Sequence, residues 1–183
     1  MVKRMSVAFL FFLGMISSVF AADSLAKFRG GIGVIPVTSG RGDGGAALPP
    51  TQTFAPEVNR NFVRGVSPPG QIWVIKDLKA DITLDGRAHV KGTGLVLGGG
   101  NNVGRIPAGA TVFATLSCGA GPVFTFHSTS PTGAPLQPNG DFQIDDTLTG
   151  DPLPTTCVNA VLLIRSTAGT QSWFAAGIAQ PQD

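Results

Sequence analysis

His127 and the aspartates that follow it are the residues whose types could perform acid–base chemistry. His127 lies in a predicted strand, and Asp141, Asp145 and Asp146 lie beyond a turn signal at 138–140. An imidazole beside a carboxylate can act as a general base or as half of a metal site. However, the chain has no Gly-x-Ser-x-Gly nucleophile setting and no His-x-His or His-x-x-x-His pair. The pattern therefore favours a polar cross-strand pair on a solvent face, with a hydrolase or metal-dependent enzyme as the alternative.

The two cysteines, Cys118 and Cys157, are the next candidates for chemistry. They could form a disulfide, a metal pair or a catalytic thiol. Two cysteines supply too few ligands for zinc, and no neighbouring histidine is placed to activate a thiol. In an exported protein an even number of cysteines indicates a bridge. We therefore expect a Cys118–Cys157 disulfide.

Two surface motifs suggest binding. Arg41-Gly42-Asp43 is the tripeptide that integrins recognise, but three residues recur by chance and the surrounding segment is rich in glycine. Trp173 and Phe174, near the C-terminus, are predicted to be an exposed pair on which a sugar could stack. Trp73, within an apolar run, is predicted to be a core residue instead.

The first 21 residues have the three parts of an export signal. Lys3 and Arg4 precede an apolar run at 6–20, and small residues follow it. Val19 and Ala21 suit the signal-peptidase groove, which predicts cleavage after Ala21. The alternative is an uncleaved membrane anchor, but the apolar run is shorter than the roughly 20 residues that span a bilayer. We expect a signal peptide at 1–21, and a secreted or periplasmic protein with no membrane span after cleavage.

The composition indicates one folded domain over residues 22–183. Removing the predicted signal takes away Lys3 and Arg4, which leaves 11 basic residues against 11 acidic ones. A neutral chain offers no electrostatic basis for binding nucleic acid or an anionic membrane. Apolar residues make up 43% of the chain, enough to bury a core.

The spacing of apolar residues indicates strands. The chain has 25 glycines and 14 prolines, which leave little room for long helices. In 110–118 every even position is apolar and the odd positions are mostly Thr or Ser, which predicts a strand with one face buried. Residues 78–84 alternate in the same way up to Asp85-Gly86. We expect a type I′ turn there and a return strand that runs on to Leu97.

Further strands are predicted along the rest of the chain. They are 122–128 and 141–146 on either side of the 138–140 turn, a buried central strand at 157–165, a last strand at 172–178, and a first, edge strand at 33–37. Residues 39–57 are predicted to be a long mobile loop. The fold class expected is all-β: an antiparallel β-sandwich of the immunoglobulin-like or transthyretin-like Greek-key kind, with one disulfide, after an N-terminal signal helix.

A glycine-rich segment, Gly98 to Arg105, superficially suggests a phosphate-binding loop. Such loops work because a helix begins immediately after them and aims free N–H groups at the anion. Here Ile106-Pro107-Ala108-Gly109 follows, which cannot begin a long helix. We predict a wide hairpin loop.

Several short blocks resemble small exported bacterial proteins of unassigned function. They are Gly30–Val37, Val63–Val66, Leu84–Arg87 with Gly94–Leu97, Ala114–Cys118, and Gly140–Phe142 with Ile144–Asp146. The resemblance implies export and brings no activity, cofactor or catalytic residue with it. The order of a Cys-ended strand and an Asn-Gly-Asp-Phe segment also resembles transthyretin-like and carboxypeptidase-regulatory sandwiches, at the level of fold.

The function expected is that of an exported, non-enzymatic sandwich without a cofactor, which binds an unknown protein, glycan or surface ligand through its loops. The alternatives are a hydrolase or metal-dependent enzyme that uses His127 and the Asp141–Asp146 segment, and a sugar-binding module that uses Trp173 and Phe174.

Overall fold

The computed structural model describes residues 23–35, 61–119 and 123–181, and within these ranges every regular element is a strand. The strands are β1 (Ser24–Gly33), β2 (Trp73–Val74), β3 (Asp77–Thr83), β4 (Arg87–Thr93), β5 (Val96–Leu97), β6 (Thr111–Cys118), β7 (Thr125–Ser128), β8 (Ala134–Pro135), β9 (Phe142–Thr147), β10 (Thr149–Gly150), β11 (Val161–Ser166) and β12 (Trp173–Ala179). The predicted all-β fold is confirmed.

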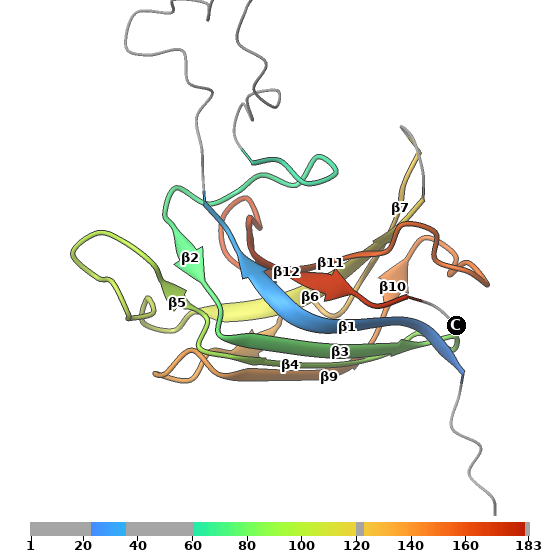
Figure 1. The fold of residues 1–183 in the computed structure, drawn as a ribbon, viewed down its shortest axis with the longest axis horizontal. Coiled ribbons are helices and arrows are strands. Elements are labelled where there is room, and N and C mark those ends of the chain that lie inside the picture. The colour runs from blue at the N-terminus through green and yellow to red at the C-terminus, as the bar shows by residue number, and fades with distance from the viewer. Residues whose placement is uncertain (1–22, 36–60, 120–122, 182–183) are drawn as a thin grey trace, which may run out of the picture.

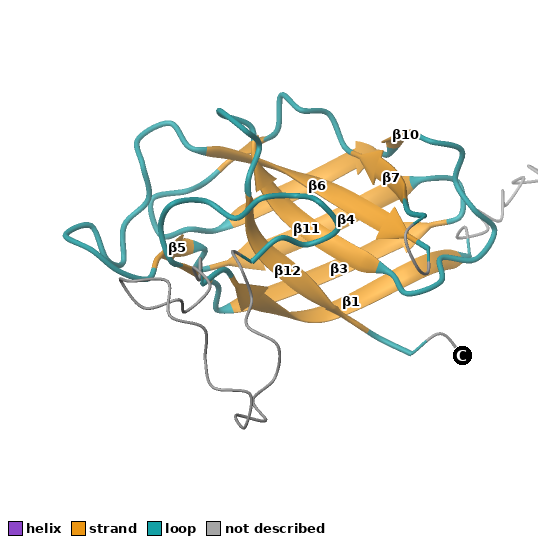
Figure 2. Cartoon of the chain, turned by 90° about the horizontal axis from the view of Figure 1, so that it is seen from above, coloured by secondary structure: helices purple, strands orange, loops and turns teal. Residues whose placement is uncertain are grey.

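One antiparallel sheet contains all of these strands except β2 and β5, in the order β10-β7-β6-β11-β12-β1-β3-β4-β9, with β8 paired to β6. The sheet folds over on itself into two layers and forms a nearly closed sandwich (Figure 1). Figure 2 shows β12, β11 and β6 of one layer crossing β3 and β4 of the other. The core lies between the layers.

Strand β1 belongs to both layers. Its first half pairs with β3 from Ser24 to Arg29, and its second half pairs with β12 up to Gly33. The register shifts between Phe28 and Gly31, where Gly30 has a φ of 82°. A positive φ suits glycine, which has no Cβ to clash with the backbone, so the strand can turn from one layer to the other here.

The expected edge strand at 33–37 is therefore wrong. The strand begins at Ser24 and is central, with hydrogen-bonded neighbours on both sides. The register shifts and the Gly30-Gly31 pair break the period-two pattern, and the alternation rule depends on that pattern. Val34 and Ile35 follow β1 without strand structure, and 36–37 lie outside the described residues.

The β3–β4 hairpin forms as predicted, but its turn differs. Gly86 N donates to Thr83 O at 2.9 Å, and Gly86 has a φ of 84° whereas Asp85 does not have a positive φ. A type I′ turn needs positive φ at both central residues, so this loop is the three-residue kind that ends in a glycine bulge. The return strand stops at Thr93, and Val96–Leu97 pairs with β2 instead.

Strand β6 is buried on both faces, which corrects the expectation of one buried face. Thr115 and Ser117, at odd positions, are each only 1% exposed. On this outer face Arg64 of the segment 61–67 donates to Ser117 Oγ, and Thr115 Oγ1 contacts Arg165 and Ser128. Val63 and Val66 of the same segment pack against the core. Figure 1 shows this segment leading into β2 over the layer that contains β6, β11 and β12. This segment lies about 50 residues away from β6 in the sequence, so the period-two pattern of apolar residues within β6 cannot reveal it.

The turn at 138–140 joins β8 to β9. Gly140 N donates to Gln137 O at 2.7 Å, and Gln137 N donates to Asp141 O at 2.8 Å. The predicted strands at 122–128 and 141–146 correspond to β7 and β9, but they do not pair with each other: β7 pairs with β6 and β10, while β9 pairs with β4. The predictions at 157–165 and 172–178 correspond to β11 and β12.

Some predictions lie outside the described residues. They are the signal peptide at 1–21, the loop at 39–57 and the tripeptide Arg41-Gly42-Asp43. In the part of the chain that the structure describes, no helix has the length and apolar character needed to cross a membrane.

Candidate functional site

The candidate site lies on the outer face of the layer formed by β1, β3, β4 and β9. Alternation along these strands sends Leu78, Ala80 and Ile82 into the core, where they are at most 2% exposed, and sends the intervening polar residues outward. On the opposite layer the segment 61–67 contacts Ser117 of β6 and Trp173 of β12. The outer face of the layer of β1, β3, β4 and β9 carries exposed charged side chains from all four strands.

Two cross-strand rows of side chains run over this face. We call the first the mixed row: Lys27, Asp81, His89 and Asp145, taken from β1 to β9. In this row Lys27 lies opposite the oppositely charged Asp81, and His89 forms a hydrogen bond with Asp145; pairs of this kind stabilise directly opposed residues in a sheet.

The second row, two residues along each strand, departs from that rule. We call Arg29, Lys79 and Lys91 the basic row; they lie directly opposite one another on β1, β3 and β4, and Gln143 continues the row on β9. Like charges that face each other directly destabilise a sheet. The basic row is therefore a local cost in stability, which binding of an anion would offset.

The contacts of the basic row leave its charge largely uncompensated. Arg29 Nη1 donates to the carbonyl oxygens of Phe28 and Ala80 at 2.7 and 3.1 Å, and neither acceptor is an anion. Lys79 lies 3.8 Å from Asp77, an exposed pair of the kind that contributes little. Among the described residues, Lys91 has no carboxylate within ion-pair distance.

His89 and Asp145 form a hydrogen-bonded pair beside the basic row. His89 Nδ1 lies 2.6 Å from Asp145 Oδ1, and Gln143 Nε2 donates to Asp145 Oδ2 at 2.5 Å. These two hydrogen bonds hold the pKa of Asp145 below its ordinary value of 3.8. The hydrogen bond with His89 has the larger effect. Asp145 is therefore a fixed anion that keeps His89 and Gln143 in place.

A hollow of about 240 Å³ lies over these side chains. Residues of both rows line it, namely Arg29, Lys79, Asp81, His89, Lys91, Gln143 and Asp145. The hollow is open to solvent and carries cationic and hydrogen-bonding groups from four adjacent strands. Such a surface can hold an anion by charge and by directed N–H donors.

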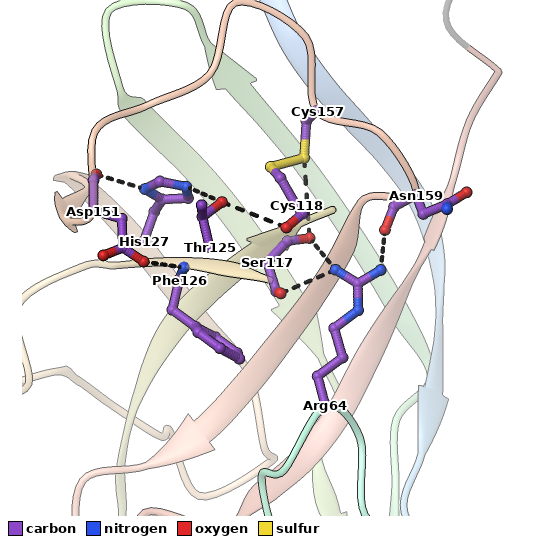
Figure 3. The surroundings of a disulfide bond; sticks show 9 residues. All are labelled: Arg64, Ser117, Cys118, Thr125, Phe126, His127, Asp151, Cys157 and Asn159. Carbon is purple, nitrogen blue, oxygen red and sulfur yellow. Dashed lines mark hydrogen bonds between the residues drawn. A yellow bond between two sulfur atoms is a disulfide. The ribbon is translucent and has the colours of Figure 1, made fainter. Parts of the chain in front are cut away.

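The histidine singled out by sequence, His127, is a buried structural residue, at 1% exposure. Its Nδ1 lies 3.0 Å from the carbonyl oxygen of Asp151, so Nδ1 carries the proton, and its Nε2 lies 2.9 Å from Thr125 Oγ1 (Figure 3). Neither partner is one of the predicted carboxylates. The predicted solvent-exposed His–Asp pair does occur on this protein, but it is formed by His89 and Asp145.

The other two aspartates of the predicted group fix loops. Asp141 accepts hydrogen bonds from Gly94 N and Asn139 Nδ2, at 3.0 and 2.9 Å. Asp146 accepts from Ser130 N at 2.7 Å. In the described part of the chain no group of three or more His, Cys, Asp or Glu side chains is placed to hold a metal ion.

The predicted disulfide is present, and Figure 3 shows it beside a second polar cluster. The Cys118 and Cys157 Cα atoms are 4.9 Å apart. Arg64, from the segment 61–67, donates to Ser117 O at 2.7 Å and to Ser117 Oγ at 2.9 Å, and also to Asn159 O. Arg64 thereby ties 61–67 to β6 and to the loop before β11. All of these partners are internal, so this cluster is structural.

The predicted exposed pair at Trp173 and Phe174 is wrong, since the two residues are 2% and 9% exposed. Trp173 Nε1 donates to Asn61 O, in the segment 61–67, at 2.9 Å. Phe174 stacks on Trp73, with ring centroids 4.0 Å apart, which confirms Trp73 as a core residue. Neither side chain of the pair is available to stack on a sugar.

Sequence reasoning missed the basic row. Alternation alone sends Lys79 and Lys91 outward, and the predicted hairpin brings their strands together. The signal was therefore available for these two residues. Arg29 was missed because β1 was not expected to begin before Gly33, and Gln143 because β9 was not expected to pair with β4.

Comparison of the chain with protein-family models, curated proteins and solved structures gives no match. The resemblance to small exported bacterial proteins and to transthyretin-like sandwiches stays a prediction. The function is therefore inferred from the geometry of the basic row and of the hollow above it.

Proposed function

We propose that this protein is a non-enzymatic binding protein that works outside the cytoplasm and holds an anionic ligand on the basic row. The observation that carries the proposal is the direct opposition of Arg29, Lys79 and Lys91 beneath an open hollow, whereas Lys27 and Asp81, which face each other in the mixed row, are not like-charged. The ligand would contact a polar sheet face rather than the loops. Binding of this kind needs no catalytic group.

The disulfide supports the location. Disulfides persist in oxidising compartments and are rare in the cytosol. The Cys118–Cys157 bridge lies in the core, at 3% exposure for each residue, where it serves structure. The export signal expected at residues 1–21 supports the same location from the sequence.

Binding of a small polyvalent anion tests the proposal. Citrate, which carries three carboxylates, would be titrated into the full chain at low ionic strength and followed by backbone amide chemical shifts. We expect the largest shifts around the basic row, and binding that weakens with added salt because the contacts are exposed charges. Lys79→Gln and Lys91→Gln should each weaken binding by about two- to fivefold, as expected for loss of one exposed charged contact of about 0.5–1 kcal/mol.

Lys27→Gln is the matched control. It removes one positive charge from the same face, but its side chain belongs to the mixed row and lies opposite Asp81. Binding should change little in this variant. Absence of citrate binding, or an equal loss in Lys27→Gln and Lys79→Gln, would overturn the proposal.

A further inference from the structure

Three hollows adjoin along the direction of the basic row. The first, over the two rows, has a volume of about 240 Å³; a second of about 300 Å³ continues over Phe142 and Gln137; a third of about 360 Å³ lies between β9 and the segment 129–135. Gln143 lines all three, Lys91 lines the first two, and Asp145 lines the first and third. Because the three hollows share these residues, we call them together the depression: its first part crosses the strands from β1 to β9, and the other two lie at the edge strand β9.

The depression changes character from one end to the other. At the β1–β4 end it offers the three cations of the basic row, with Asp81 and His89 beside them. The end between β9 and 129–135 is lined by the hydroxyl residues Ser130 and Thr132 and by the carboxylate residues Asp145 and Asp146. Asp146 already accepts from Ser130 N and Ser130 Oγ from Thr132 N, so these oxygens have only their remaining lone pairs for a ligand. A ligand that matches this pattern carries its negative charge at one end and hydrogen-bond donors without negative charge at the other.

The direction of the depression constrains the ligand further. A peptide that added a strand to the free edge of β9 would run parallel to β9. The depression instead runs across the strands, from Arg29 on β1 to Gln143 on β9, which is three strand spacings or roughly 14 Å. A ligand seated along it is therefore elongated and lies across the sheet.

We infer that the ligand is an acidic oligosaccharide, with an acidic sugar on the basic row and neutral sugars in the hollows beside β9. This inference rests on the proposed function, because it requires anion binding at the basic row. Sugar hydroxyls donate to carboxylates and exchange hydrogen bonds with Ser and Thr hydroxyls, which are the groups at the far end. A ligand charged along its whole length would instead face Asp145 and Asp146, and like charges disfavour that arrangement.

The experiment compares the binding of an acidic trisaccharide with the binding of its acidic part and of its neutral part, each measured separately. The full chain would be titrated with 3′-sialyllactose, which joins one acidic sugar to two neutral ones, and separately with N-acetylneuraminic acid and with lactose. A peptide of four glutamates serves as the acidic peptide comparison. We expect the trisaccharide to bind at least about tenfold more tightly than either of its parts, and more tightly than the peptide.

Two variants locate the two ends. Lys91→Gln should weaken the trisaccharide and the acidic sugar alike. Thr132→Val should weaken the trisaccharide several-fold and leave the acidic sugar unchanged, since the loop itself uses the Thr132 backbone N–H, which donates to Ser130 Oγ, and not the Thr132 hydroxyl. Lys27→Gln, on the mixed row, is the control that should change neither.

The outcomes separate this inference from the proposed function. If the acidic sugar or citrate binds as tightly as the trisaccharide, or if Thr132→Val has no effect, the oligosaccharide is overturned and anion binding stands. Tighter binding of the glutamate peptide overturns the oligosaccharide in favour of an acidic peptide. If citrate and every other anion fail to bind, the proposed function itself fails.

Discussion

Lys79 and Lys91 lie directly opposite each other on β3 and β4, and Arg29 lies opposite Lys79 on its other side. Two residues further along the same strands, Asp81 lies opposite His89. One hairpin thus carries a cross-strand pair without like charges and one of like charges on the same exposed face. Because the solvent face of a sheet accepts many residue types, packing does not require the second pair.

The stability cost of the Lys79–Lys91 pair can be measured by reversing one charge. Lys91→Glu places opposite charges across β3 and β4 and should raise the free energy of unfolding by about 0.2–1 kcal/mol. Chemical denaturation at low ionic strength measures the change. The same variant should lose citrate binding, so that stability rises while binding falls.

Salt provides the check on this explanation. The gain should shrink as salt is added, because the pair is exposed and screened. Lys91→Gln, which removes the repulsion without adding attraction, should give a smaller gain than Lys91→Glu. A loss of stability in both variants would contradict the view that the basic row is kept for binding.

The sequence predicts the β3–β4 hairpin, β6, β11, β12 and the disulfide, because each depends on local alternation, turn residues or cysteine count. It does not predict β1, whose alternation is interrupted by a bulge and two glycines, nor the contact of the segment 61–67 with β6. Both of these depend on contacts between segments far apart in the chain. The two-faced burial of Ser117, for example, follows from Arg64, 53 residues away.

The candidate site is predictable only in part, for the same reason. The sequence predicts an exposed cross-strand pair of a histidine and an aspartate, and the structure contains one. The order of the strands in the sheet decides which histidine and which aspartate form it. β9 pairs with β4 and not with β7, so Asp145 meets His89 and not His127. The order of strands is a property of the whole sheet, and local patterns do not encode it.

Arg64 is predicted to be the residue that holds the segment 61–67 in place. Arg64→Ala removes the hydrogen bonds to Ser117 and Asn159 and leaves the acceptors of the buried Ser117 without their charged donor. The free energy of unfolding should fall by about 1.5–3 kcal/mol, the range for hydrogen bonds to charged groups. Hydrogen exchange should show faster exchange in 61–67.

Arg64→Lys is the matched variant. It keeps the charge but has no planar fork to reach both Ser117 and Asn159, so it should recover only part of the loss. Full recovery by lysine would show that charge alone, and not the paired geometry, secures the segment.

The disulfide is predicted to stabilise the fold substantially. Its two cysteines are 39 residues apart, for which the loss of loop entropy in the unfolded chain corresponds to about 4 kcal/mol as an upper guide. The double variant Cys118→Ala and Cys157→Ala should unfold at a markedly lower temperature, measured by circular dichroism. Added reductant should lower the melting temperature of the native chain and have no effect on the variant; equal responses would contradict a structural role.

The His89–Asp145 pair should affect how the stability of the folded protein falls at low pH. Because its hydrogen bonds lower the pKa of Asp145 in the folded protein, Asp145 contributes stability that is fully present above its ordinary pKa of 3.8 and is lost as the pH falls through the lowered folded value. His89→Ala removes the larger cause, so the pKa of Asp145 should rise towards 3.8, as measured by carboxyl chemical shifts in an NMR titration. Stability should then fall less between pH values of about 5 and about 2 in the variant.

Asp85 is the internal control for this titration. A hydrogen bond from Thr83 is the main cause of its own lowered pKa, and that pKa should not move in His89→Ala. An unchanged pKa for Asp145 would mean that Gln143 alone accounts for the lowering. His89 would then be able to form a hydrogen bond with the ligand in place of the one with Asp145.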